Sequence, residues 1–141
     1  MIPHKGYMLD TNILIYLIKN KPSAVAERIN ALDDKTPLCM SFITYAELLK
    51  GAERSTKSAR VIRQLEDLVR YIPVRWQVTR TFCEHYARQS TRLQQADTPI
   101  GANDLWIACH ALSEDMTLVT HNTREFCRIE ALKLEGWTER S

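Results

Sequence analysis

Three acidic residues lie where a protein could use them together for chemistry. Asp10 directly follows a short apolar segment, and Glu47 and Asp104 lie near the starts of two predicted helices. Carboxylates at short range cannot all stay ionised without a cation, and their oxygens select Mg²⁺ or Mn²⁺ over softer metals. Mg²⁺ held by few carboxylates keeps bound waters, one of which can attack a phosphodiester. If these residues converge, their types therefore suit metal-assisted hydrolysis.

Each acid also has an ordinary structural interpretation. Asp10 could cap the helix that follows, Glu47 could pair with Lys50 on a helix surface, and Asp104 could favour the positive end of its helix dipole. Asp104 is the hardest to explain this way, because its helix is apolar on most of its surface and burying a lone carboxylate is costly. Spacing alone leaves both interpretations open.

Short apolar strands alternate with helices along the chain. Strands are predicted at 6–9, 38–41, 71–74 and 117–120, and helices at 13–19, 22–32, 44–52, 58–69, 78–95 and 104–113. A break is predicted at 20–23, Pro73 places its strand at a sheet edge, and Asn103 is predicted to cap the last helix. The alternation predicts one α/β domain over 1–141, with a central, mostly parallel sheet of four to five strands and helices on both faces.

This topology would bring the three acids together. The carboxyl ends of parallel strands share one rim of the sheet, and ligands bind in the crevice outside that rim. Asp10 follows the first predicted strand, and Thr120 ends the last one. Residues far apart in the sequence can therefore meet there.

Composition narrows the class of protein without naming a partner. The chain has 141 residues, of which 45% are hydrophobic and 26% charged, and its net charge is +2. These are the values of an ordinary globular domain, and the small charge decides nothing about nucleic-acid binding. The sequence shows no apolar run of membrane-spanning length and no signal peptide, so we expect no membrane and a cytoplasmic location. The four cysteines lack zinc-site spacing, so we expect inert thiols.

Four segments carry polar residues beside apolar runs, in order over nearly the whole chain: Met8–Ile15, Ser41–Ala52, Pro99–Ala108 and Leu118–Phe126. Together they resemble the four motifs of PIN-domain nucleases, and most closely those of the VapC toxins of bacterial toxin–antitoxin pairs. The resemblance implies a Mg²⁺- or Mn²⁺-dependent endoribonuclease with Asp10, Glu47 and Asp104 as the metal-binding and catalytic acids.

The same resemblance implies partners. The chain would form a homodimer and a higher hetero-oligomer with a cognate VapB-type antitoxin, which lays a C-terminal segment across the catalytic groove. The chain would be linked to promoter DNA only indirectly, because the antitoxin binds that DNA. The implied substrate is structured RNA such as tRNA, with the anticodon region of initiator tRNA favoured.

The fourth motif departs from the family pattern. Many PIN domains carry a fourth acid after the late strand, where this sequence has Asn122, whose amide adds no negative charge. Glu125, one helical turn later, could substitute or be a surface acid, which leaves the number of metal ions open. Thr11, Asn12 and Thr120 are predicted to orient ligands or waters.

Several further assignments stay open from sequence. The candidates for RNA contact are the basic run after the second motif, Lys50, Arg54, Lys57, Arg60 and Arg63, together with Arg92, although a solvated helix face fits them equally well. Trp106 could stack on a base or pack in the core. Phe42, Tyr45 and Leu49 could line the antitoxin groove or the core. Two rival functions also remain: a PIN-like domain that binds RNA or protein without cleaving, and another metal-dependent phosphohydrolase.

Overall fold

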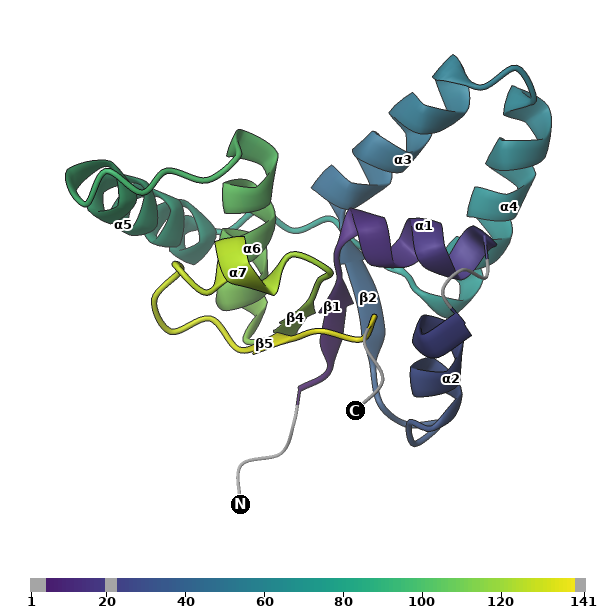
Figure 1. Cartoon of the computed structure of the whole chain (residues 1–141), viewed down its shortest axis with the longest axis horizontal. Helices are drawn as coiled ribbons and strands as arrows, with labels where there is room; N and C mark the ends of the chain where they lie inside the picture. Colours follow the sequence, from purple (N-terminus) through teal and green to yellow (C-terminus); the bar gives the residue numbers. More distant parts are fainter. Residues whose placement is uncertain (1–4, 20–22, 139–141) are drawn as a thin grey trace.

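The computed structural model describes residues 5–19 and 23–138. The strands are β1 (Tyr7–Leu9), β2 (Leu38–Ser41), β3 (Val74–Arg75), β4 (Thr117–Val119) and β5 (Leu134–Glu135). The helices are α1 (Thr11–Lys19), α2 (Ser23–Asn30), α3 (Phe42–Arg54), α4 (Ser58–Tyr71), α5 (Arg80–Gln95), α6 (Ala102–Glu114) and α7 (Thr123–Phe126). Figure 1 shows the sheet between two groups of helices.

The strands form one parallel sheet in the order β3-β2-β1-β4-β5. This confirms the predicted α/β class, the mostly parallel sheet and the helices on both of its faces. β3 lies at an edge, as Pro73 predicted, but it begins at Val74 because α4 continues to Tyr71. β5 was not predicted, since two residues are too few to show a hydrophobic period.

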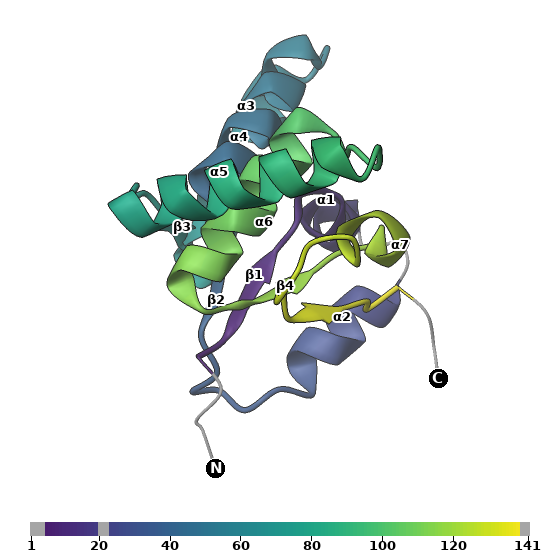
Figure 2. The ribbon, with the colours of Figure 1, turned by 90° about the vertical axis from the view of Figure 1, so that its left-hand side faces the viewer.

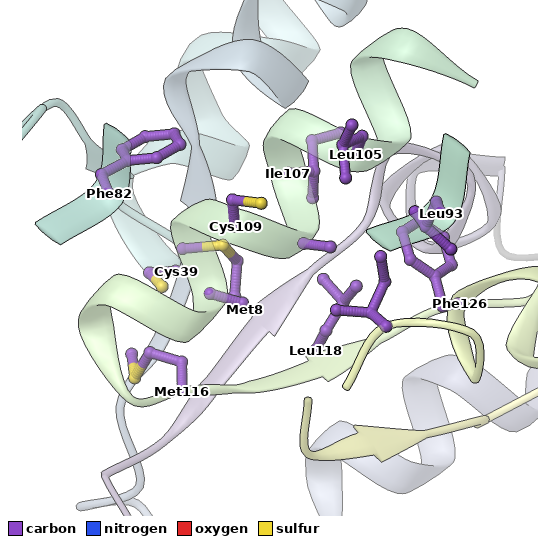
Figure 3. Packing of buried hydrophobic residues seen from close by; sticks show 13 residues of the cluster. Met8, Cys39, Phe82, Leu93, Leu105, Ile107, Cys109, Met116, Leu118 and Phe126 are labelled. Atoms are coloured by element: carbon purple, nitrogen blue, oxygen red, sulfur yellow. The ribbon is translucent and has the colours of Figure 1, made fainter. Parts of the chain in front are cut away.

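Alternate strand residues face two separate cores. Met8, Cys39 and Leu118 pack with residues of α5, α6 and α7, as the close view in Figure 3 shows. Their neighbours Leu9, Met40 and Val119 pack with residues of α1, α2, α3 and α4 on the opposite face. Successive strand side chains point to opposite faces, so a sheet covered on both sides needs such uninterrupted apolar strands.

The carboxyl ends of β1, β2 and β4 lie at one rim. They lead into α1, α3 and α7, and α6 passes the same rim over one face of the sheet (Figure 2). The main chain fastens this rim, because the Asp10 N–H donates to the Val119 carbonyl oxygen at 2.9 Å. Four helix N-terminal regions are thereby brought around one point.

Several helix starts differ from the prediction: α3 begins at Phe42 instead of 44, and α5 at Arg80 instead of 78. α1 begins at Thr11, directly after Asp10: the Leu14 N–H donates to the Asp10 carbonyl oxygen at 3.2 Å, and the Thr11 N–H donates to Asp10 Oδ1 at 2.8 Å. α6 begins at Ala102 with Gly101 as its N-cap, so the prediction that Asn103 caps this helix was wrong. The predicted break at 20–23 lies mostly outside the described residues. Over 5–19 and 23–138, no helix combines the length and apolarity needed to cross a bilayer.

Candidate active site

Asp10 lies at the end of β1, buried with only 4% of its surface exposed. Both of its carboxylate oxygens accept hydrogen bonds, from the Thr11 N–H at 2.8 Å and from Thr120 Oγ1 at 2.8 Å. Burial raises the pKa of Asp10, while these two donors act to lower it because they stabilise the charged form. The site thus holds a buried carboxylate in a fixed orientation.

Glu47 lies in the second turn of α3, one turn later than predicted, because Ser41 caps a helix that already starts at Phe42. Thr11 Oγ1 donates to Glu47 Oε1 at 2.6 Å. Asn103 Nδ2 donates to Glu47 Oε2 at 3.3 Å. One carboxylate therefore connects three helices, α1, α3 and α6.

Asp104 lies half-buried in the first turn of α6. Burial raises its pKa to about 7, and the charges of Asp10, Glu125 and Glu47 add to the effect. The Asp104 carboxyl also shares a hydrogen bond with Glu125, which raises the pKa because it favours the protonated form. The shift therefore shows both that the four acids lie close enough to repel one another and that Asp104 has little local compensation.

Glu125 supplies the fourth acid of the site, which the sequence left open because Asn122 stands where many PIN domains have an acid. The Gly101 N–H donates to Glu125 Oε1 at 3.0 Å, and Asn122 Nδ2 donates to Glu125 Oε2 at 2.6 Å. The Glu125 carboxylate also raises the pKa of Asp104, so its charge acts within the site. Asn122 in turn donates its N–H to Thr120 Oγ1 at 3.0 Å. Asn122 thus positions an acid rather than replacing one.

The other predicted site residues lie further from this centre. Asn12 is exposed in the first turn of α1 and, in the described part of the chain, bonds none of the four acids. Lys50 and Arg54 are exposed on α3. Arg92 is partly exposed, and its guanidinium donates to the Gln89 side chain at 3.1 Å and to the Arg128 carbonyl. Their RNA contacts stay predictions.

The aromatic candidates pack within the protein. Trp106 stacks on Tyr86 with ring centroids 3.7 Å apart. Phe42 packs against the core on the α5–α6 side, and Tyr45 and Leu49 pack against the core on the other side. The core interpretation of these residues is therefore the one that the structure favours.

A groove of about 760 Å³ runs from Glu47 between α1, α3 and α4. Its walls are mostly apolar, and its basic members are Lys19, Lys57 and Arg60; Lys50 and Arg54 are not among the described residues that line it. Lys57 and Arg60 were among the basic residues predicted to contact RNA. The groove itself was not predicted, since its residues come from three helices and the α3–α4 connection, whose mutual packing no local pattern specifies.

The four acids fit a hydrated divalent ion better than a fully enclosed one. Over 5–19 and 23–138, no group of three or more His, Cys, Asp or Glu side chains is arranged to hold a metal by itself. Mg²⁺ is usually bound through one or two carboxylates while it keeps several waters. Burial and the charges of the other acids both raise the pKa of Asp104, and a cation would offset both effects because it stabilises the ionised carboxylate.

The PIN domain profile matches residues 7–132 of this chain. The chain belongs to the PIN domain family. This PIN domain is 49% identical over 133 residues to "Ribonuclease VapC1" of Haemophilus influenzae (strain R2866), covering 94% of the chain and 98% of the relative. It is 39% identical over 132 residues to "tRNA(fMet)-specific endonuclease VapC" of Shigella flexneri, covering 94% and 98%.

Solved structures show the same fold at similar identity. The VapBC-1 structure from nontypeable Haemophilus influenzae matches this PIN domain with a TM-score of 0.87 and 49% identity, over 94% of the chain and 98% of that chain. VapBC2 from Rickettsia felis, bound to a DNA fragment from its promoter, matches with a TM-score of 0.86 and 35% identity, over 93% and 98%. The resemblance to VapC toxins is confirmed.

Proposed function

We propose that this protein is a divalent-metal-dependent endoribonuclease, the toxin of a toxin–antitoxin pair. The observation that carries the proposal is the convergence of Asp10, Glu47 and Asp104, with Glu125 as a fourth acid. The pKa of Asp104 rises to about 7, first through burial and then through the charges of the other three acids. A bound Mg²⁺ or Mn²⁺ would activate a water and offset charge on the phosphate that is being cleaved.

Each acid has a distinct part in holding that ion. Asp10 is oriented by the Thr11 N–H and the Thr120 hydroxyl, and Glu125 by the Gly101 N–H and the Asn122 amide. Because the pKa of Asp104 is raised to about 7 and ligand carboxylates must be ionised, Asp104 would lose its proton to solvent if it held a cation. The acidic site would therefore carry more negative charge when a metal ion is bound than when it is empty.

We propose structured RNA as the substrate, with tRNA first and the anticodon region of initiator tRNA favoured. Support comes from the relative of Shigella flexneri, which is named as a tRNA(fMet)-specific endonuclease. Lys57 and Arg60 line the groove beside Glu47, where they would contact phosphates that flank the cleaved bond.

We further propose a VapB-type antitoxin as the partner, acting in the cytoplasm. The apolar walls of the groove suit a segment of a small protein that covers the acids, and related VapBC complexes have been solved. The expected assembly is a homodimer of this chain within a higher hetero-oligomer, with promoter DNA bound through the antitoxin.

The test is cleavage of a tRNA pool by the purified protein with Mg²⁺, with Mn²⁺ and with EDTA, read as mapped 5′ ends. Cleavage is expected with either metal, is abolished by EDTA, and is suppressed when a VapB-type antitoxin is added. RNA that is bound but uncut would favour a binding protein, and equal turnover of DNA or mononucleotides would favour another phosphohydrolase. Cleavage that persists in EDTA would contradict the metal dependence.

A further inference from the structure

Asn103 is a polar residue in the first turn of α6, but it does not cap that helix. It lies inside α6, whose N-cap is Gly101, so its side chain does not cap the helix. Within the described residues its side chain makes one hydrogen bond, from Nδ2 to Glu47 Oε2 at 3.3 Å. We propose that Asn103 is a positioning residue that holds the Glu47 carboxylate for metal binding, an inference that rests on the proposed function.

The two oxygens of Glu47 accept hydrogen bonds from two different helices. Thr11 on α1 donates to Oε1 at 2.6 Å, and Asn103 on α6 donates to Oε2. The Thr11 hydroxyl is itself fixed, because its oxygen lies 3.3 Å from that of the buried Thr44. A glutamate side chain loses substantial rotamer freedom when it is ordered, so a second donor reduces the entropy that metal binding must still remove.

The chemistry of an amide suits this role. The Asn103 amide donates without carrying charge, so it orients Glu47 and leaves the site negative for a cation. A lysine or arginine at the same place would neutralise the carboxylate and compete with the ion. Because Asn103 is followed by Asp104, the first turn of α6 supplies one acid and also the donor that orients another.

The test is a double-mutant cycle on Mn²⁺ affinity, measured by calorimetry without RNA on wild type, Asn103→Ala, Glu47→Gln and the double variant. Asn103→Ala is expected to weaken Mn²⁺ binding roughly tenfold, as loss of a ligand's hydrogen-bond partner commonly does. In the Glu47→Gln background the same change is expected to have an effect of about twofold or less, because Asn103 acts through Glu47.

Folding and metal binding are separated by the controls. Asn103 is exposed and alanine favours helix, so the Tm of metal-free Asn103→Ala is expected to match or slightly exceed that of wild type. An equal effect of Asn103→Ala in both backgrounds would overturn the inference. So would unchanged affinity in Asn103→Ala beside weakened binding in Glu47→Gln, although the proposed metal site would then stand. A wild type that binds no Mn²⁺ would instead overturn the proposed function itself.

Discussion

Asp10 and Asp104 belong to one site, yet their surroundings differ. Asp10 is almost fully buried, at 4% exposure, while Asp104 is half-buried. Burial by itself would give Asp10 the larger rise in pKa. Instead Asp104 has the large rise, to about 7. The depth of a carboxylate therefore does not decide its charge here.

Hydrogen-bond donors explain the difference. The Thr11 N–H and the Thr120 hydroxyl both lower the pKa of Asp10 and so oppose its burial. Asp104 receives no such donor from the described residues; its carboxyl shares a hydrogen bond with Glu125 that raises its pKa, and neighbouring acids raise the pKa of both residues. The pKa of Asp10 is still raised, because burial outweighs the two donors, but these donors stabilise its charged form and no comparable donor stabilises that of Asp104.

The largest expected effect comes from removing the charge of Asp104. Asp104→Asn should lower the rate of RNA cleavage roughly a hundredfold or more, because an amide cannot supply the charge that a Mg²⁺ ligand needs. Asp10→Asn should do the same, since both acids are needed once the ion is bound. The measurement is single-turnover cleavage of tRNA at saturating Mg²⁺.

Glu66→Gln, on an exposed part of α4, is the matched control and should cleave at the wild-type rate. If Asp104→Asn retained wild-type activity while Asp10→Asn lost it, Asp10 alone of the two would be needed for cleavage. Asp104 would then have only a structural role.

A smaller effect should follow when Asp10 is made to resemble Asp104. Thr120→Val keeps the shape of a fully buried side chain but removes a donor to Asp10, so the pKa of Asp10 should rise. Mn²⁺ affinity at neutral pH should fall about tenfold. The loss should diminish as pH increases, because the carboxylate ionises again. Calorimetric titrations between pH 6 and pH 8.5 would measure this.

Thr120→Ser is the matched control for this change. It keeps the hydroxyl and loses one buried methyl group, which costs about 1 kcal/mol of folding stability but should leave Mn²⁺ affinity near that of wild type. Reversed results, with Ser weakening the binding and Val preserving it, would mean that packing at Thr120, and not its hydrogen bond, supports Asp10.

Much of this site was predictable because it depends on chain direction and periodicity. A short apolar strand before Asp10 and an apolar helix after Asp104 are local patterns, and the parallel topology then brings both to one rim. Glu47 was placed at the same rim for the same reason. Only its turn along α3 was wrong, since the Ser41 cap starts that helix earlier.

What the sequence did not reveal depends on contacts between distant residues. Asn103 was predicted as a cap because asparagine before an apolar helix usually is one, and its partner Glu47 lies 56 positions away. Arg92 was a candidate for RNA contact, yet its guanidinium bonds Gln89 and the Arg128 carbonyl. The charge of an arginine shows in the sequence, but whether the fold already uses it does not.

The smallest expected effect is on the stability of the metal-free protein. The pKa of Asp104 is about 7 in the folded state against 3.8 as its ordinary value. Between these pH values the folded state holds a proton that the unfolded chain releases, so this contribution is complete below about pH 4 and is lost as pH rises through 7. In EDTA, the Tm of wild type should therefore fall between pH 5 and pH 8 by a few degrees relative to that of Asp104→Asn. Adding Mg²⁺ at pH 8 should restore the wild type alone, whereas parallel Tm curves for the two proteins would show that Asp104 does not carry the repulsion of the site.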